Sequence, residues 1–400
     1  MSKTEMPAIR FCGFDNAWEQ RKLSDLAEIV GGGTPDTNNP AYWDGDIDWY
    51  APAEMEGQRY AVGSVRKITE LGLQKSSAKM LPAHRTVLFT SRAGIGKMAI
   101  LQRSAATNQG FQSLALKDGT DPYFVYSMGD KIKDMAESVA SGSTFLEISG
   151  KMLGNLEVMI PTIEEQKEIA SFFREIDDLI TIHQRKFGKL TNVKKSMLEK
   201  MFPRNGSCYP EIRFKEFTAP WEQRKLGDCF TERVESMPDG ELISVTINDG
   251  IKKFSELGRH DNSNDDKSKY KKVCVGDIAY NSMRMWQGAS GYSPYEGIVS
   301  PAYTVLSPNS GINSKCLAYQ FKLPEMIHTF QVNSQGITSD NWNLKYPALS
   351  QIEIFVSKDE QEQAKIAEYF ENLDHLITLH QRELEKLQSI KKALLEKMFV

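Results

Sequence analysis

Residues 165–202 read EQKEIASFFREIDDLITIHQRKFGKLTNVKKSMLEKMF, and residues 362–399 read EQAKIAEYFENLDHLITLHQRELEKLQSIKKALLEKMF. The two segments are repeats of one sequence at an offset of 197 residues. In each, a seam residue recurs at alternating spacings of four and three, which is typical of a coiled-coil helix. The seam positions are Ile169, Phe173, Ile176, Ile180, His183, Phe187, Leu190, Lys194, Met197 and Met201, and in the second copy Ile366, Phe370, Leu373, Ile377, His380, Leu384, Leu387, Lys391, Leu394 and Met398.

A helix with one apolar seam needs a partner, and the simplest partner for each of these helices is the other one. Pro161 precedes the first helix and Pro203 follows it, as expected at helix boundaries. A duplicated interface closes most simply around a two-fold axis. We therefore expect an antiparallel two-helix coiled coil with pseudo-two-fold symmetry; the alternative is a parallel pair.

Four polar residues lie on the predicted seam. His183 and His380 occupy the same seam position near the middle of their helices. We expect them to fix the register, as single buried polar residues do in coiled coils. A metal or catalytic role is disfavoured, because no cluster of carboxylates and cysteines accompanies them. Lys194 and Lys391 are expected to bury their stems and keep their ammonium groups in water.

A second pair of repeats lies upstream of the helices. Residues 7–25 read PAIRFCGFDNAWEQRKLSD and residues 210–228 read PEIRFKEFTAPWEQRKLGD, at an offset of 203. The first copy thus has six more residues between its W-E-Q-R-K-L motif and its helix. The segments in between, roughly 30–160 and 233–356, show little mutual similarity. We interpret the repeats as a frame and the dissimilar segments as heads that recognise different things.

This organisation predicts four segments: a head over residues 1–160, a helix over 161–204, a second head over 205–357 and a second helix over 358–400. Strands are predicted in the heads, between turn-forming residues, which indicates an α/β or α+β fold. The predicted strands are residues 46–50, 86–89 and 98–101 in the first head, and 277–280, 302–306 and 352–356 in the second.

The composition gives mixed signals about partners. The formal net charge is −4, whereas nucleic-acid-binding domains are often strongly basic. A nucleic-acid binder of this composition would need its basic residues on one face, or partner subunits that supply the phosphate contacts. The five cysteines are scattered and form no C-x-x-C pair, so they indicate neither a zinc site nor a disulfide framework, and we expect a reducing cytoplasm. We expect neither a membrane span nor a signal peptide.

Three loops combine basic, amide and aromatic side chains: residues 91–97 (SRAGIGK), 108–112 (NQGFQ) and 281–288 (NSMRMWQG). Arg and Lys pair with guanine edges, and Asn and Gln with adenine edges. The alternative is ordinary loop composition with a few surface hydrogen-bonding groups. The candidate DNA-contacting residues in these loops are Ser91, Arg92, Lys97, Asn108, Gln109, Asn281, Arg284, Trp286 and Gln287.

Motifs that resemble catalytic ones are incomplete. Residues 39–42 read NPAY and lack the second Pro of the N-P-P-Y loop of amino-methyltransferases, and no F-x-G-x-G loop precedes them. Residues 121–124 (DPYF) fail in the same way, and Gly96-Lys97 lacks the first Gly and the Ser or Thr of a phosphate loop. We therefore predict no catalytic, cofactor-binding or metal-binding residues in this chain.

Together, several motifs resemble the specificity subunit of type I restriction–modification enzymes. They are the duplicated W-E-Q-R-K-L motifs, residues 32–35 (GGTP) before residues 42–47 (YWDGDI), residues 142–144 (GST) before Ile160-Pro161, residues 281–288 before residues 297–303 (GIVSPAY), and the E-Q-x-x-I-A helix starts. The resemblance covers essentially the whole chain. Ser143 and Thr144 join the candidate DNA-contacting residues on this basis.

The resemblance implies that each head is a target recognition domain that reads one half of a split site in double-stranded DNA. The paired helices would set the gap and dock two modification subunits, which bind S-adenosylmethionine and methylate adenine at N6. Two restriction subunits would add translocation and cleavage with ATP and Mg²⁺. The heptad stretch spans ~48 Å at ~1.5 Å per residue, somewhat more than one turn of B-DNA at ~34–36 Å.

Two other classes of function remain open at this point. A stand-alone methyltransferase or nuclease would bind cofactor or cut DNA without partners. A scaffolding adaptor would bind two unrelated peptides, and exchange of one head would leave DNA protection unchanged.

Overall fold

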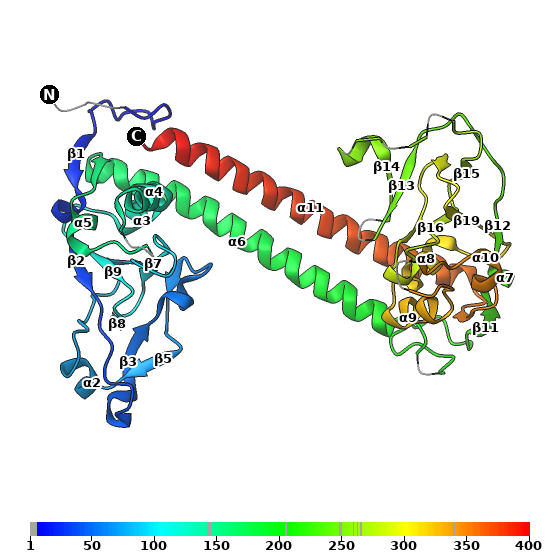
Figure 1. The fold of residues 1–400 in the computed structure, drawn as a ribbon, viewed down its shortest axis with the longest axis horizontal. Helices are drawn as coiled ribbons and strands as arrows, with labels where there is room; N and C mark the ends of the chain where they lie inside the picture. Colours follow the sequence, from blue (N-terminus) through cyan, green and yellow to red (C-terminus); the bar gives the residue numbers. More distant parts are fainter. Residues whose placement is uncertain are drawn as a thin grey trace. The chain divides into compact units, whose positions relative to one another are not determined.

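The computed structural model describes residues 6–141, 146–204, 206–247, 250–258, 260–261, 263–264, 266–338 and 341–400. The chain forms two compact units, Met1–Gln184 with Arg382–Val400, and Arg185–Gln381. Two long helices, α6 (Ile163–Lys200) and α11 (Glu360–Met398), each contribute one half to each unit (Figure 1). The units therefore divide the chain differently from the four predicted segments, because each helix is shared.

The head of the first unit has two sheets, besides the two-stranded ribbon described below. Its larger sheet has the strand order β2-β9-β6-β7-β4, and its smaller sheet has the order β5-β3-β8. The strands are β2 (Ala27–Gly31), β3 (Trp43–Tyr50), β4 (Tyr60–Ala61), β5 (Arg66–Ile68), β6 (Thr86–Phe89), β7 (Met98–Leu101), β8 (Ala105–Thr107) and β9 (Gln112–Leu116). Three helices follow, α3 (Pro122–Ser127), α4 (Gly129–Val139) and α5 (Gly150–Gly154).

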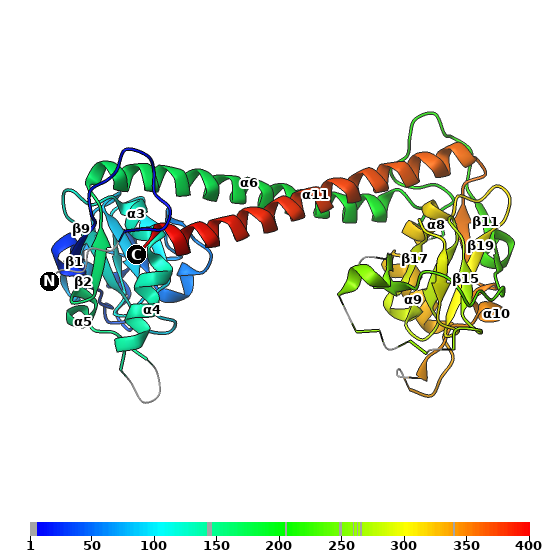
Figure 2. The same cartoon turned by 90° about the horizontal axis from the view of Figure 1, so that it is seen from above.

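The central strands of this sheet are buried on both faces. Val87 and Phe89 of β6 contact the core that includes α3 and the start of α6, whereas Leu88 faces a separate core on the other side. The position of α3 next to the start of α6 is visible in Figure 2. A strand covered on both faces is continuously apolar, as TVLF and MAIL are. The predictions for residues 86–89 and 98–101 are confirmed.

The second unit is built in a related way. Its main sheet has the order β12-β19-β16-β17, and β13 pairs with β14 and β15 with β18. The strands are β12 (Phe230–Glu232), β13 (Ile243–Thr246), β14 (Gly250–Lys253), β15 (Lys271–Val273), β16 (Ile278–Asn281), β17 (Ser290–Tyr292), β18 (Gly297–Val299) and β19 (Tyr303–Pro308). The helices are α8 (Ser314–Gln320), α9 (Pro324–Val332) and α10 (Tyr346–Leu349).

The repeated W-E-Q-R-K-L motif forms the same ribbon in both units. β1 (Glu19–Lys22) pairs antiparallel with β10 (Glu157–Ile160), and β11 (Glu222–Lys225) pairs antiparallel with β20 (Glu353–Val356). The registers correspond, since Glu19 faces Ile160 and Glu222 faces Val356. Each ribbon precedes a long helix, so the duplicated sequences give duplicated structure.

The helices are antiparallel within each unit. In the first, Lys391 Nζ lies 2.7 Å from an Asp177 oxygen, and the rings of Phe173 and Phe399 are 5.9 Å apart. Lower numbers on α6 therefore pair with higher numbers on α11, as the antiparallel prediction requires.

The same contacts recur in the second unit with the roles of the helices exchanged. Lys194 Nζ lies 2.5 Å from Asp374, and the rings of Phe202 and Phe370 are 6.1 Å apart. This exchange of roles is what pseudo-two-fold symmetry predicts. Lys194 and Lys391 are 27% and 25% exposed, and each also forms an ion pair with an aspartate of the opposite helix, a contact that the sequence did not predict.

The predicted seam is buried most deeply where each helix begins. Ile169 and Phe173 belong to the core of the first unit, together with Met398 and Phe399 from the end of α11. Farther along, the seam is only partly covered, and His183 and His380 are half-buried. Their role in setting the register stays a prediction. Among the described residues, no helix is long and apolar enough to cross a membrane.

Candidate nucleic-acid interface

The two principal candidate loops occupy the same place in the two heads. Residues 91–97 lie in the connection from β6 to β7, and residues 281–288 in that from β16 to β17. Each connection joins two antiparallel neighbours in the main sheet of its head. The two loops are therefore structurally equivalent, although their sequences differ.

The loop of the first head has a tightly constrained backbone. Thr90 N donates a hydrogen bond to Lys97 O at 3.0 Å, and Gly96 N donates to Thr90 O at 2.9 Å. Gly96 has a φ of 86°, and a Cβ there would lie 2.4 Å from the side chain of Lys133. Ala93 also has a positive φ, of 55°, which is unusual for a residue with a Cβ. Strained backbone of this kind persists where the surrounding structure fixes it.

The structure places two of the predicted loops of the first head together. Ser91 N donates to Gly110 O at 2.8 Å, which joins residues 91–97 to residues 108–112. The Asn108 side chain accepts from Gly110 N at 2.8 Å and so holds its own turn. Gln109 is exposed and hydrogen-bonds with Thr34. Ser91, Arg92, Lys97, Asn108 and Gln109 thus belong to one loop cluster.

In the second head, some candidate residues serve the loop itself. Asn281 Oδ1 accepts from Met283 N at 3.0 Å, and Trp286 Nε1 donates to Met283 O at 3.1 Å. Arg284 is exposed, and its guanidinium donates to Gln287 at 3.3 Å. The geometry therefore leaves Arg284 and Gln287 facing solvent, while Asn281 and Trp286 help to fix the loop. Ser143 and Thr144 lie outside the described residues.

Sequence reasoning missed Lys322, which connects this loop to the rest of the head. Lys322 Nζ donates to Gly288 O at 2.6 Å and to Ile247 O at 3.2 Å. Burial, and secondarily the charge of Lys194, lowers the pKa of Lys322 to about 8. The lysine lies in the turn between α8 and α9, and no motif in the sequence marks it.

The motifs that resembled catalytic ones are helix caps. Asn39 Oδ1 accepts from Ala41 N at 3.1 Å, at the start of a short 3₁₀ helix. Asp121 Oδ1 accepts from Tyr123 N at 2.8 Å and from Phe124 N at 3.0 Å, at the start of α3. Asn and Asp are favoured at this position because they satisfy free backbone N–H groups, so both sequences have a structural explanation.

A buried ion pair ties each ribbon to its long helix. Arg10 donates two hydrogen bonds to Glu165, at 2.6 and 2.7 Å, and Trp18 Nε1 donates to the same carboxylate at 3.3 Å. The second unit repeats these contacts. Arg213 donates to Glu362 at 2.6 and 2.8 Å, and Trp221 Nε1 donates at 3.1 Å. A bidentate arginine–carboxylate pair fixes both distance and orientation.

Each unit also exposes one pair of apolar residues on the long helices. Leu179 and Ile182 of α6 and their repeats Leu376 and Leu379 of α11 are between 40% and 46% exposed. The repeat thus places equivalent exposed apolar side chains on both long helices.

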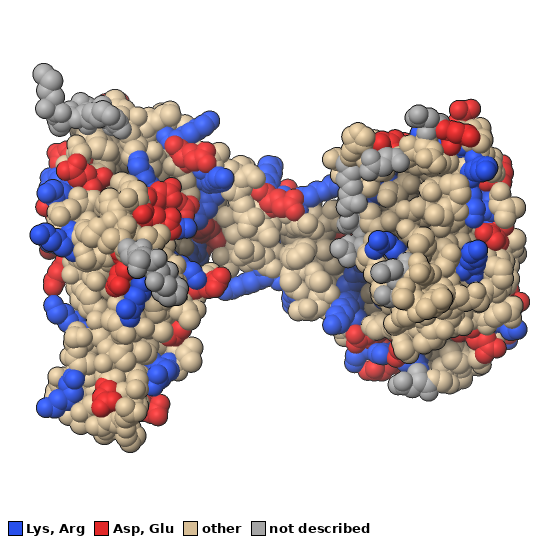
Figure 3. All heavy atoms as spheres, in the orientation of Figure 1, with Lys and Arg blue, Asp and Glu red and all other residues tan. Residues whose placement is uncertain are grey.

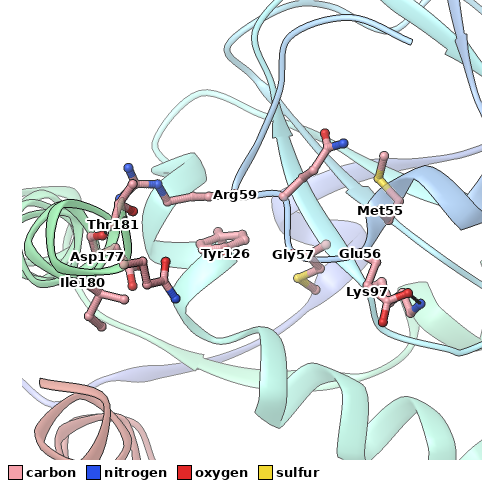
Figure 4. A pocket seen from close by; sticks show the side chains of 12 residues that line it. Met55, Glu56, Gly57, Arg59, Lys97, Tyr126, Asp177, Ile180 and Thr181 are labelled. Atoms are coloured by element: carbon pink, nitrogen blue, oxygen red, sulfur yellow. Dashed lines mark hydrogen bonds and ion pairs between the residues drawn. The ribbon is translucent and has the colours of Figure 1, made fainter. Parts of the chain in front are cut away.

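A hollow of about 360 Å³ lies between α6 and residues 55–59 in the first unit. Figure 4 shows Asp177, Ile180 and Thr181 of α6 lining it, with Arg59 and Tyr126. Its charged lining residues, Glu56, Arg59, Lys97 and Asp177, include both signs, so it indicates no single class of charged ligand. Both signs are also interspersed over the faces of the two units shown in Figure 3.

Three known proteins with similar sequences are named as specificity subunits of type I restriction enzymes. The MjaIX type I specificity subunit of Methanocaldococcus jannaschii is 34% identical over 230 residues, which cover 55% of this chain and 52% of the relative. The EcoR124I/EcoR124II subunit of Escherichia coli is 26% identical, over 40% of this chain and 41% of its own length. The matches thus span about half or less of these two relatives. The MjaVIII subunit of M. jannaschii is 23% identical over 94% of this chain and 91% of its own length.

The fold also has a match among solved structures. A crystal structure of a type I restriction–modification S subunit from M. genitalium aligns with a TM-score of 0.63 at 16% identity, covering 99% of both chains. The family model for the type I restriction modification DNA specificity domain matches residues 16–192 and again residues 219–389. These two ranges cover most of the chain, so the protein belongs to the type I restriction modification DNA specificity family, with two copies of the domain.

Proposed function

We propose that this chain is the DNA specificity subunit of a type I restriction–modification complex, and that each head reads one half of a split site in double-stranded DNA. The observation that carries the proposal is the pair of equivalent loops, residues 91–97 and 281–288, that differ in sequence while the surrounding frame is repeated. Two such loops on one repeated frame suit two unlike half-sites, because base edges are read by loop side chains.

The long helices, in this proposal, set the gap between the half-sites and dock two modification subunits. The repeated apolar pairs Leu179 with Ile182 and Leu376 with Leu379 support docking, because two equivalent surfaces suit two copies of one partner. The modification subunits bind S-adenosylmethionine and transfer its methyl group to adenine N6. Two restriction subunits provide ATP- and Mg²⁺-dependent translocation and cleavage, so this cytoplasmic chain performs no catalysis.

The mixed charges in Figure 3 fit a subunit that works inside such an assembly. With a net charge of −4, the chain has little excess positive charge for the phosphate backbone. In the proposed complex, the partner subunits supply most of the phosphate contacts, and the heads supply base contacts.

The test is to express the chain with its modification subunits in a host without adenine methylation and to sequence the methylated adenines. We expect one bipartite motif with an unread gap of about half a helical turn or slightly more. A continuous motif, or no motif with the subunits present, would contradict the proposal. Cofactor binding or DNA cleavage by the purified chain alone would favour a stand-alone enzyme instead.

A further inference from the structure

Residues 335–338 and 341–343 form two antiparallel arms in the second head, called the hairpin below, that the sequence did not single out. Gln335 and Asn343 exchange backbone hydrogen bonds of 3.0 and 2.8 Å, and Asn341 N donates to Thr338 O at 2.9 Å. Gly336 lies against the chain opposite, where a Cβ would come within 2.6 Å of Asn341 O. The described part of this hairpin thus has a defined shape; residues 339 and 340 are outside it.

The hairpin is attached to the candidate DNA-reading loop. Leu344 N, directly after the hairpin, donates to Ser282 O at 2.9 Å. The rings of Trp342 and Trp286 meet edge to face, with centroids 5.3 Å apart. Aromatic pairs in this geometry contribute beyond their buried area. The hairpin and residues 281–288 therefore form one continuous surface.

The first head has the same attachment with a different sequence. Ser141 and Glu147 exchange backbone hydrogen bonds of 3.1 and 3.0 Å, and Ile148 N donates to Ser91 O at 3.1 Å. Ser91 and Ser282 hold corresponding places in the two equivalent loops. An attachment that persists while the sequence around it changes indicates that both heads need these two elements side by side.

The exposed side chains of the hairpin include both amides and an apolar residue. Ile337 is 99% exposed, and Gln335 and Asn341 are exposed as well. Asn341 Nδ2 donates to Thr338 Oγ1 at 3.3 Å, which leaves the amide a second N–H and its Oδ1 for a base edge. In the major groove, Asn or Gln pairs with the N6 and N7 edge of adenine, and apolar side chains contact the thymine methyl group. An A·T pair offers both features together.

We infer that the two hairpin arms, residues 335–338 and 341–343, are a second base-reading element of the second head, and that Asn341 with Ile337 reads an A·T pair of its half-site. The inference rests on the proposed function and adds the residues and base pair to it. The loop with Arg284 and the hairpin with Asn341 then read different positions of one half-site.

The test uses N341A and I337A, each expressed with the modification subunits, followed by sequencing of methylated adenines. We expect an A·T position in the second half-site to accept other bases, with discrimination reduced roughly 5- to 150-fold, the equivalent of ~1–3 kcal/mol. N333A is the matched control, because Asn333 is also exposed but lies at the end of α9, outside the hairpin, with its amide bonded to Thr329 O at 2.9 Å. This control keeps the motif unchanged.

The outcomes separate the two proposals. Absence of a bipartite motif for the unmodified chain overturns the proposed function. A bipartite motif that N341A and I337A leave unchanged overturns only the inference, and so does relaxation at a G·C pair. If a variant loses methylation altogether, competition binding by its purified complex, with oligonucleotides varied one base at a time, decides by the same criteria. The unchanged first half-site shows that the variant complex is folded.

Discussion

The starts of the two long helices share equivalent side-chain contacts, whereas the equivalent loops of the two heads differ in sequence. At the helix starts, Glu165 and Glu362 accept hydrogen bonds from equivalent arginine and tryptophan side chains. The loops at residues 91–97 and 281–288 occupy equivalent places and share little beyond their backbone anchors. Side-chain identity is therefore constrained where a buried carboxylate must be paired, and is free where only the backbone is anchored.

One contact joins a repeated residue of the frame to a residue whose position differs between the heads. Asp177 accepts a hydrogen bond from Tyr123 OH at 2.8 Å, and its repeat Asp374 accepts one from Tyr319 OH at 2.9 Å. Tyr123 lies two residues after the N-cap of α3, whereas Tyr319 lies six residues after that of α8. The frame supplies the same carboxylate twice, and each head supplies the hydroxyl from a different position. A head can therefore vary in sequence and still dock on the helix.

The largest expected effect on stability comes from removing the buried glutamates at the starts of the long helices. E165A and E362A remove the carboxylates that pair with Arg10 and Arg213, and these arginine side chains are only 10% and 13% exposed. We expect each to lower the free energy of unfolding by about 3–5 kcal/mol, as measured by denaturant titration. E362A should cost more, because Ser357 Oγ also donates to Glu362, at 2.5 Å.

The variant S357A provides the control for that difference. In the S357A background, E362A should cost about as much as E165A does alone. A loss below about 1 kcal/mol for either glutamate, within the range of exposed pairs, would show that the pairs do not stabilise the frame.

A smaller effect concerns the attachment of one loop. K322M removes the hydrogen bonds from the charged Lys322 Nζ to Gly288 O and Ile247 O, at a cost of about 1.5–3 kcal/mol. We expect weaker binding of the second half-site and an unchanged first half-site, measured with oligonucleotides altered in one half. K345M is the control, because Lys345 is exposed. Equal loss at both half-sites would exclude a local role for Lys322.

Substitution of a candidate base-contacting arginine should affect only the half-site of its own head. R284A is expected to weaken or relax recognition of the second half-site only, by ~1–3 kcal/mol for a bidentate guanine contact. R92A is its counterpart in the first head and should affect the first half-site only. Methylation motifs of the two variants check this. A change in the half-site of the opposite head would contradict independent reading.

The smallest expected effect comes from removing the tyrosine hydroxyls that bind Asp177 and Asp374. Y123F and Y319F each remove one hydrogen bond to a frame aspartate and should lower the free energy of unfolding by about 1 kcal/mol. Double-mutant cycles with D177N and D374N should give similar coupling energies in the two units. Coupling in only one unit would mean that the two tyrosines are not equivalent.

The repetitive parts of the fold could be predicted from the sequence because they rest on local patterns. The heptad spacing predicted both long helices, their duplication predicted the antiparallel pairing, and the apolar runs predicted β6 and β7. The position of residues 281–288 as the counterpart of residues 91–97 followed from their composition, and the strand order agrees.

What could not be predicted depends on contacts between distant residues. Lys322 binds carbonyl groups 34 and 75 residues away. Glu165 receives Arg10 across 155 residues, and the Trp286–Trp342 contact joins two loops that share no motif. Backbone carbonyl partners leave no trace in side-chain composition. For the same reason, the indole of Trp286 suggested base contact, whereas its N–H is bonded to Met283 O.

The most direct test of the central claim inserts one heptad into both long helices, after His183 and after His380, and sequences the methylated adenines. The repeated frame should lengthen the gap, by about three base pairs if the added ~10 Å is transmitted at ~3.4 Å per base pair. Both half-sites should keep their sequences, because the heads are untouched. An altered half-site, or a gap of unchanged length, would contradict the claim that the frame sets distance and the heads set sequence.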